Sequence, residues 1–226
     1  MIKINENSIR IEYNKYKDKA KVSLEKKELN KALNYCEYIA LIARGVPISE
    51  DFCDLDVEKI LEEIGKELIP KNEIPNSKGK ENRIIFYTTE IIDRGGLTEQ
   101  YLNFFMSQNY EILLVVPNKK NITGNNYINL LRNYKNYRIF YPKGNSRDSK
   151  IIEISKEIIN FEPSKAFLQF VPNDVVGFTV FSQFKNIERY YIDANDHTFW
   201  LGVNCADYFI EFRTFGYLIS KEERKI

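Results

Sequence analysis

The sequence predicts an α/β protein with a Rossmann-like parallel sheet, helices on both faces of the sheet, and a small helical unit in front of it. Two patterns support this prediction. Beyond residue 82, short apolar runs rich in β-forming residues alternate with stretches of helical periodicity, as in successive β-α-β units. Before residue 70, apolar residues recur only at helical spacing. With 226 residues, of which 43% are hydrophobic, the chain is long enough for one such domain and a helical appendage.

The helical unit is expected over residues 1–70. Its clearest helix starts at Leu29 and stops at Gly45, with Pro47 just beyond. A shorter, lysine-rich helix precedes it, and a third helix follows, with Asp54 or Asp56 as its N-cap. The apolar stripe of the central helix consists of Leu29, Ala32, Leu33, Cys36, Ile39, Ala40 and Ala43. Such stripes need a partner surface, so we expect these helices to pack on the α/β unit.

Residues 71–82 are rich in proline and lysine and lack periodicity, which predicts a linker and a domain boundary. The Rossmann-like unit is therefore expected over residues 83–226. Its predicted strands are Arg83–Thr89, Tyr110–Val116, Tyr137–Tyr141, Lys165–Phe170, Ile187–Asp193 and Asp207–Phe212, and its predicted helices are Leu97–Gln108, Tyr127–Tyr134, Ile151–Asn160 and Val175–Phe184.

Charge and motif content exclude several classes of protein. There are 33 basic and 32 acidic residues, a balance that argues against a nucleic-acid partner. Three widely spaced cysteines and a single histidine predict neither a disulfide framework nor a metal site, and suit a reducing cytoplasm. No stretch has the length of a spanning helix, although attachment to a membrane surface stays open. Neither a G-x-G-x-x-G motif nor a P-loop is present, which argues against a dehydrogenase and an NTPase, so we expect no bound cofactor. The sequence shows no metal-ligand cluster, so we also expect no metal.

Ligands of open parallel sheets bind at the carboxyl ends of the strands, so the segments after the strands contain the candidate site residues. After the first strand, Gly95, Gly96 and Leu97 lead into a helix. Paired glycines allow close approach of a phosphate to the backbone, and a helix N-terminus favours negative charge. The alternative is a tight turn that needs glycine only for its backbone angles.

After the fifth strand, the only histidine lies within the segment 193–202, next to Asp196. His197 could act as a general base or bind a sugar hydroxyl or a phosphate, and Asp196 could orient it or bind a hydroxyl. The alternative for His197 is a capping or core hydrogen bond. The following Phe199, Trp200 and Leu201 are expected to be packing residues.

Two further segments contribute candidate ligand-binding residues. Glu211 and Arg213 alternate with aromatic residues after the sixth strand, so they project to one face. A salt bridge is the alternative role for this pair. Asn173 follows the fourth strand, where Asn173 or Asp174 could equally serve only as a helix cap.

With these residues in view, the part of the chain from residue 83 onward resembles the N-terminal, acceptor-side half of bacterial glycosyltransferases with the two-domain B-type fold, especially those that make cell-surface polysaccharides. The segment Asp93-Arg-Gly-Gly-Leu-Thr-Glu99 resembles the glycine-rich first loop, whose backbone faces the diphosphate of a nucleotide sugar. The segment Asn195-Asp-His-Thr-Phe-Trp-Leu-Gly202 is similar to a stretch reading approximately His-Ala-Asp-His-x-Phe-Trp-Leu-Gly. Ala194 stands where that pattern has its first histidine, which removes any mechanism that needs a histidine pair.

The resemblance implies transfer of a sugar from a nucleotide-sugar donor to a glycan or glycosylated acceptor. It places the protein in the cytoplasm and leaves attachment to the inner membrane surface open. It implies donor phosphate at Gly95, Gly96 and Leu97, and catalysis by His197 with Asp196. It also implies substrate contacts from Arg213, Glu211 and Asn173. In this family a C-terminal half binds most of the nucleotide, so we expect the 226 residues to need such a domain or a partner chain, and to be inactive alone.

A non-catalytic interaction module is the competing hypothesis. In it, the helices before residue 70 dock a partner and the Rossmann-like unit is a scaffold. The replacement of the first histidine by Ala194 favours this hypothesis, whereas Gly95, Gly96 and His197 favour the enzyme.

Overall fold

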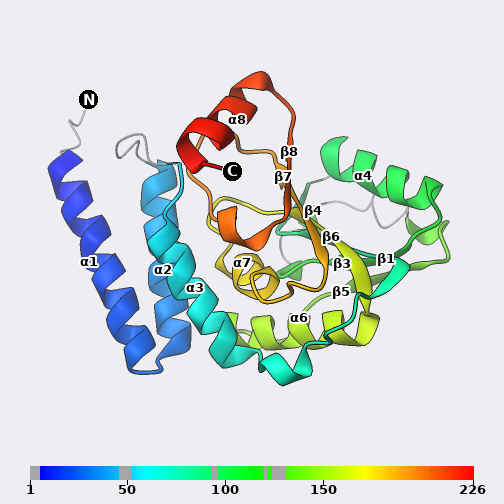
Figure 1. Ribbon diagram of the computed structural model, residues 1–226, viewed down its shortest axis with the longest axis horizontal. Coiled ribbons are helices and arrows are strands. Elements are labelled where there is room, and N and C mark those ends of the chain that lie inside the picture. Colours follow the sequence, from blue (N-terminus) through cyan, green and yellow to red (C-terminus); the bar gives the residue numbers. More distant parts are fainter. Residues whose placement is uncertain (1–5, 46–51, 93–95, 120–121, 124–130) are drawn as a thin grey trace.

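The computed structural model describes residues 6–45, 52–92, 96–119, 122–123 and 131–226 (Figure 1). Its main sheet has six strands, all parallel, in the order β5-β3-β1-β6-β7-β8. In chain order these are strands 3-2-1-4-5-6, the order of doubly wound nucleotide-binding sheets. The strands are β1 (Lys80–Thr88), β3 (Glu111–Val115), β5 (Tyr137–Phe140), β6 (Pro163–Gln169), β7 (Glu188–Asp193) and β8 (Tyr208–Glu211). The α/β prediction is therefore confirmed.

The central strands are apolar along their length because helices cover both faces of the sheet. In β1, Ile84 and Phe86 pack in one core, with α4 (Gly96–Ser107). Ile85 and Tyr87 alternate with them and pack in a second core on the opposite face, with α6 (Arg147–Phe161) and α7 (Val175–Phe181). All four side chains are fully buried.

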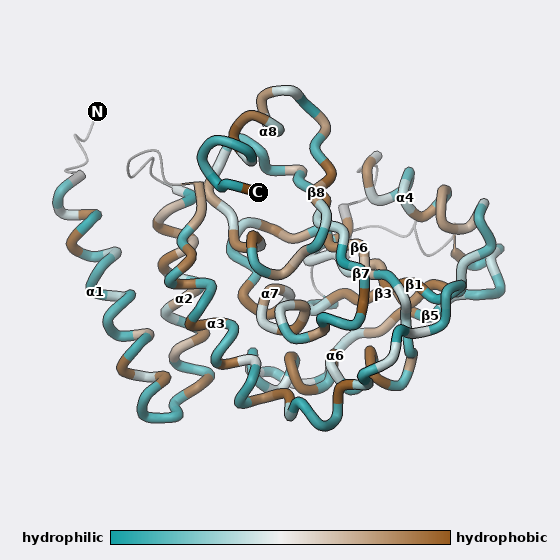
Figure 2. Tube along the Cα trace, in the orientation of Figure 1, coloured by the Kyte–Doolittle hydropathy of each residue, from teal (hydrophilic) through white to brown (hydrophobic). Residues whose placement is uncertain are grey.

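The three N-terminal helices share the second core with the sheet. They are α1 (Glu6–Glu25), α2 (Leu29–Gly45) and α3 (Leu55–Leu68). The buried stripe of α2 and that of α3 belong to the same hydrophobic cluster as α6, α7 and the inner strands. In Figure 1, α2 and α3 lie between α1 and the α/β unit, and Figure 2 shows that α1 is largely hydrophilic. The Asp54 carboxylate caps α3 through the N–H groups of Asp56 and Val57.

Several details differ from the sequence-based expectation. β1 begins at Lys80, inside the expected linker, because the Lys80 N–H donates to the carbonyl of Glu162 at 2.8 Å. The linker also contains a 3-10 turn, η1 (Lys71–Glu73), and a two-stranded parallel sheet forms from β2 (Ile91–Ile92) and β4 (Ile122–Thr123). Of the helix expected over residues 127–134, residues 127–130 lie outside the described residues.

The C-terminal segment forms helical structure that the sequence did not predict. After a 3-10 turn, η3 (Val203–Cys205), and strand β8, the chain forms α8 (Thr214–Ile219) and a π-helical turn, η4 (Ser220–Arg224). Figure 1 shows α8 folded back over the end of the sheet, beside β7 and β8. This segment lies at the carboxyl ends of the strands, where ligands of doubly wound sheets bind.

Candidate functional site

A polar cleft of about 320 Å³ lies at the carboxyl ends of the strands on the face that carries α6 and α7. We call it the switch-point cleft, because the strand order reverses between β1 and β6, and segments following both strands line it. Its lining is Glu37, Thr89, Pro117, Asn118, Asn145, Arg147, Lys150, Val171, Asn173, Asp174, Val175 and Val176. The position agrees with the rule that crossovers diverging from adjacent strands open a crevice.

Asp174 lies in the wall of this cleft, where three hydrogen bonds fix its side chain. Its buried carboxylate accepts hydrogen bonds from the Tyr87 hydroxyl at 2.8 Å, from the Gly177 N–H at 2.8 Å, and from the Thr89 hydroxyl. Burial raises the pKa of Asp174, although these three hydrogen bonds act in the opposite direction. The bond to Gly177 caps α7, so Asp174 takes the capping role that the sequence left open between Asn173 and Asp174.

Three other polar side chains of the cleft are available to a ligand. The Lys150 ammonium and the amides of Asn145 and Asn173 make no side-chain hydrogen bond within the described part of the chain. Arg147, in contrast, is occupied by Asn34 and Glu37 of α2. A cation between two amides can bind hydroxyl, carbonyl or anionic oxygen atoms.

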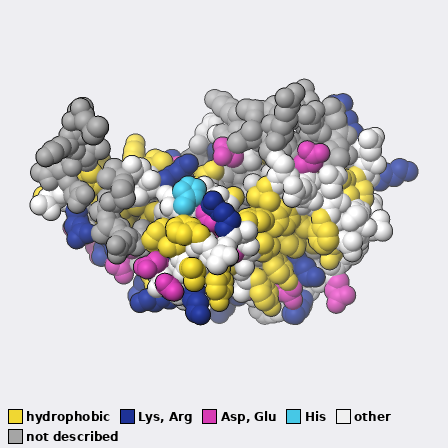
Figure 3. Space-filling view, turned by 90° about the horizontal axis from the view of Figure 1, so that it is seen from above, with side chains coloured by type: hydrophobic (Ala, Val, Ile, Leu, Met, Phe, Trp, Pro, Cys, Tyr) yellow, Lys and Arg dark blue, Asp and Glu magenta, His cyan; other side chains and the backbone are white. Residues whose placement is uncertain are grey.

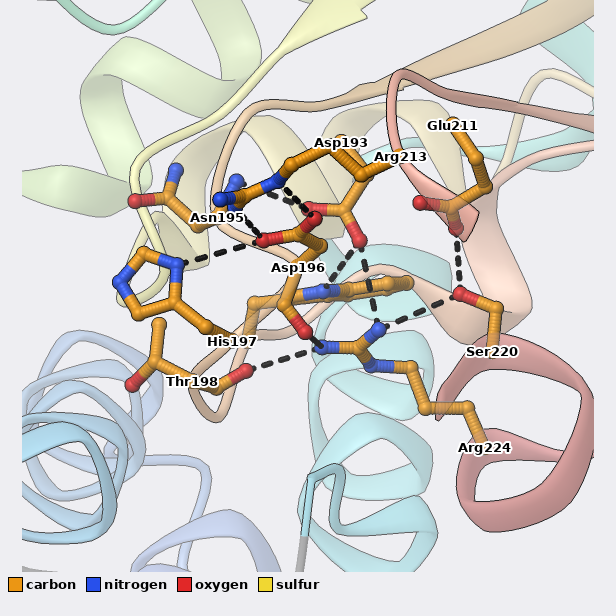
Figure 4. A network of polar contacts seen from close by, with 10 residues as sticks. Asp193, Asn195, Asp196, His197, Thr198, Glu211, Arg213, Ser220 and Arg224 are labelled. Atoms are coloured by element: carbon orange, nitrogen blue, oxygen red, sulfur yellow. Dashed lines mark hydrogen bonds and ion pairs between the residues drawn. The ribbon is translucent and has the colours of Figure 1, made fainter. Parts of the chain in front are cut away.

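A second polar site lies where β7 and β8 end. We call it the β7–β8 rim and define it as residues 193–198, Glu211 and Arg213 (Figure 4). At its surface, His197 Nδ1 lies 3.3 Å from Asp196 Oδ1, and the His197 side chain is 64% exposed. Figure 3 shows the histidine at the surface, with basic and hydrophobic side chains beside it.

Arg213 holds Asp196 in place. Its Nε donates to Asp196 Oδ2 at 2.8 Å and its Nη2 donates to Oδ1, which makes a two-point ion pair. Burial opposes ionisation of Asp196, but the hydrogen bonds from Arg213 and His197 and the charge of Arg213 lower its pKa overall. Asp196 is thus an ionised acceptor facing His197.

Glu211 and Arg213 do not pair with each other. Glu211 turns inward and accepts a hydrogen bond from the Ser220 hydroxyl, whereas Arg213 turns toward Asp196 (Figure 4). The Oε2 atom of Glu211 is buried without a hydrogen-bond partner, and burial raises the pKa of this carboxyl group. The Arg213 side chain remains 60% exposed, so of the two residues Arg213 is the one open to a ligand.

The residues after His197 are packing residues, as expected. Phe199, Trp200 and Leu201 are buried, and the Trp200 indole stacks on Tyr191 with ring centroids 4.4 Å apart. A side chain at Gly202 would lie 2.5 Å from the Tyr191 ring, so the close packing of this loop requires glycine. The N–H groups of residues 202, 203 and 204 donate to the carboxylate of Glu58, which extends from α3.

The glycine-rich segment is described only from Gly96 onward, so the expected phosphate contact of Gly95 lies outside the described residues. Gly96 starts α4, and it is not among the described residues with positive φ. Among the described residues, a Cβ atom at Gly96 would meet Gln100 Nε2 at 3.7 Å, an ordinary van der Waals contact. No described contact therefore excludes a side chain at position 96. The Leu97 side chain is half-buried against the core beneath α4.

The structure thus brings Asp196, His197 and Arg213 together, with Glu211 to one side where it binds Ser220, and places Asn173 in the switch-point cleft. No residue of the β7–β8 rim is among those that line the switch-point cleft. One backbone hydrogen bond links segments next to the two sites, from the Leu201 N–H to the Pro172 carbonyl at 3.0 Å. Sequence reasoning missed Asn145 and Lys150, although Asn145 follows the third strand and the strand-end rule could have found it. It also missed the buried Arg224, near the chain's last residue, for which no local pattern gives a signal.

Within the described ranges, no group of three or more His, Cys, Asp or Glu side chains could hold a metal ion. No described helix is long and apolar enough to cross a membrane. Comparison of the chain with models of known protein families, with curated proteins and with solved structures found no match. The resemblance to glycosyltransferases therefore rests on the residues quoted above, and it stays a prediction.

Proposed function

We propose that this chain is the acceptor-side half of a glycosyltransferase, and that it transfers a sugar from a nucleotide-sugar donor to a glycan hydroxyl once a donor-binding domain or partner chain completes it. The observation that carries the proposal is the geometry of His197, which is exposed at the carboxyl edge of a doubly wound sheet and faces an ionised carboxylate.

The chemistry follows from the two ring nitrogens of His197. A neutral ring whose Nδ1–H donates to Asp196 presents an unprotonated Nε2 to solvent, and Figure 4 shows this second nitrogen turned away from Asp196. Nε2 can accept the proton of an acceptor hydroxyl while the hydroxyl oxygen bonds to the anomeric carbon of the donor. The nucleoside diphosphate leaves with the electrons of the broken bond. Asp196 stabilises the imidazolium ion that forms.

The switch-point cleft supports a polyhydroxylated ligand. Lys150, Asn145 and Asn173 supply donors and acceptors whose hydrogen bonds are not used inside the described part of the protein. We assign this cleft to the acceptor glycan, and the backbone at Gly96 to the diphosphate of the donor. Close approach of a ligand to the backbone would account for glycine at this position, where no described contact excludes a Cβ atom.

An interaction module without catalysis is the second candidate function. The observation in its favour is a set of exposed hydrophobic side chains along β8 and α8, namely Tyr208, Phe212, Phe215, Tyr217 and Leu218. Such a surface is typical of protein–protein contacts. It would also suit the contact between the two halves of a glycosyltransferase, so it does not by itself separate the candidates.

Binding of the labelled chain to a glycan array tests the proposal. We expect saturable binding to a restricted set of glycans, and a loss of about tenfold or more in affinity for Lys150→Ala, because a charged hydrogen bond is removed. Lys156→Ala is the matched control, since Lys156 lies on the same helix but does not line the cleft. Absence of glycan binding, or equal affinities for wild type and Lys150→Ala, would contradict the proposal.

A further inference from the structure

A second arginine, Arg224, contacts the β7–β8 rim from inside the protein and is completely enclosed. Arg224 ends the π-helical turn η4, and its side chain has no exposed surface. Its guanidinium group lies over the Trp200 ring, 4.2 Å from the ring centroid. Arginine is almost never fully buried in a protein unless it is paired, so the partners of Arg224 need to be identified.

The contacts of Arg224 converge on the backbone around His197. Its Nη2 donates to the carbonyl oxygens of Asp196, at 3.3 Å, and of Thr198, at 2.9 Å (Figure 4). These are the residues immediately before and after His197. The other terminal nitrogen, Nη1, donates to Asp193 Oδ2 at 3.3 Å and to the Ser220 hydroxyl at 3.2 Å.

This arrangement limits the positions that the His197 backbone can take. In the planar guanidinium, Nη2 binds both neighbouring carbonyl groups while Nη1 binds Asp193 and Ser220. The single nitrogen of a lysine ammonium cannot make both sets of contacts with the same geometry. The guanidinium is itself fixed by Trp200 and Asp193, and the Trp200 indole N–H donates to the same Asp193 oxygen at 3.0 Å. The His197 ring is thus presented to Asp196 from a backbone that is held on both sides.

The pair of Arg189 and Asp207 provides an internal comparison. Arg189 is also a buried arginine that pairs with an aspartate, through Nε at 2.9 Å and through Nη2 at 2.5 Å, and it donates to the carbonyl of Phe181. None of these contacts involves residues 196–198. Both arginines are buried and pair with an aspartate, although Asp207 is 39% exposed whereas Asp193 is enclosed. Only Arg224 also holds the backbone that carries the histidine.

We propose that Arg224 is a positioning residue for His197: by binding the carbonyl groups of Asp196 and Thr198, it keeps Nδ1 of His197 directed at Asp196 and Nε2 directed outward. The C-terminal turn is then part of the reaction site, although Arg224 touches no substrate. The inference rests on the proposed role of His197 as the general base.

The single histidine of the chain makes a direct test possible, because all imidazole signals of the protein come from His197. Two-bond ¹H–¹⁵N correlation spectra at alkaline pH, where an imidazole is neutral, report which ring nitrogen carries the proton. We expect the Nδ1–H tautomer to predominate in the wild type. In Arg224→Lys we expect a shift toward the Nε2–H tautomer, which an unconstrained histidine side chain favours.

Arg189→Lys is the matched control, because it weakens the ion pair of another buried arginine that makes no contact with residues 196–198. It should lower the melting temperature and leave the tautomer populations unchanged. If Arg224→Lys does not fold, Ser220→Ala removes only one partner of the guanidinium, and it should shift the populations in the same direction to a smaller extent.

Two results would overturn the inference. The first is a folded Arg224→Lys protein with the tautomer populations of the wild type, or the same result for Ser220→Ala if Arg224→Lys does not fold. The second is a change in Arg189→Lys as large as that in Arg224→Lys. The spectra need no activity, so the outcome separates this inference from the proposed function. If the wild type binds glycan and the tautomer populations of Arg224→Lys are unchanged, only the role of Arg224 is excluded. If the wild type binds no glycan and Arg224→Lys shows the expected tautomer shift, the proposed function is excluded and the positioning contact remains.

Discussion

His197 is the residue on which the proposed chemistry depends, and it differs in burial from the residues that orient it. The ring is mostly exposed, whereas the residues that orient it, Asp196 and Arg224, are buried. A side chain that contributes little to the core can be changed with small effect on folding, so its substitution reports mainly on chemistry.

Replacement of His197 by alanine in the completed enzyme should reduce turnover by about 10²-fold or more, because the proton of the acceptor hydroxyl loses its base. The melting temperature should change little, since the side chain is 64% exposed. Steady-state kinetics and thermal unfolding of the same preparation check both expectations. A strongly lowered melting temperature with unchanged kinetics would make His197 a structural residue.

Substitutions at Gly96 test the expected donor contact separately. Gly96→Ala and Gly96→Val should both fold, because among the described residues a Cβ atom here meets Gln100 at 3.7 Å, an ordinary van der Waals contact. Affinity for the nucleotide sugar should fall from glycine to alanine to valine, as the side chain obstructs close approach of a phosphate to the backbone. Calorimetric titration of the completed enzyme with nucleotide sugar measures this order, and equal affinities in all three proteins would exclude the contact.

The sequence could place His197 at the edge of the sheet, because the residues that follow an apolar strand lie at its carboxyl end. It could not predict that Asp196 pairs with Arg213, since that contact depends on β8 running beside β7. The burial of Arg224 could not be predicted from the sequence either. The short segment of mixed charge that contains Arg224 shows no periodicity, and the position of the side chain depends on the π-helical turn that this segment forms.

At the scale of elements, the six strands were predictable because parallel strands buried on both faces are apolar along their length. The predicted and observed bounds differ by up to three residues, most at Lys80, where pairing with the end of α6 extends β1 into the linker. In contrast, α8 has only six residues, and its side chains Phe215, Tyr217 and Leu218 are exposed. The helix therefore has no buried apolar stripe by which the sequence could predict it.

One contact between elements makes stability depend on pH. Burial raises the pKa of Glu58 to about 7, although the three N–H groups of residues 202–204 lower it. The folded state therefore retains a proton that the unfolded chain, with an ordinary value of 4.5, releases earlier. The free energy of unfolding should fall as pH rises from about 4.5 to about 7, by roughly 3 kcal/mol at most.

Urea unfolding of wild type and Glu58→Gln across this pH range measures the effect. The variant should lose that part of the pH dependence, because an amide does not titrate. Glu63→Gln is the matched control on the same helix, where the exposed Glu63 pairs with Lys66. A slope that persists unchanged in Glu58→Gln would show that other groups cause it.

For the whole molecule, the main feature is that the N-terminal helices share one of the two cores with the sheet. The linker between them is largely exposed, so trypsin should cut first between Pro70 and Asn82. Because α2 and α3 bury their apolar stripes against the same cluster, the two fragments should remain together after cleavage. Size-exclusion chromatography of the nicked protein checks this, and early cleavage within α2 or separation of the fragments would contradict it.

If the carboxyl edge of this sheet is a glycan site, His197 faces the bound hydroxyl. Titration of the chain with glycans from the array, followed through the ring signals of its single histidine, measures this. We expect a saturable shift of these signals with the same dissociation constant as glycan binding, weakened in Lys150→Ala and retained in Lys156→Ala. Glycan binding that leaves the histidine signals unchanged at saturation, or no binding by any glycan, would contradict this expectation.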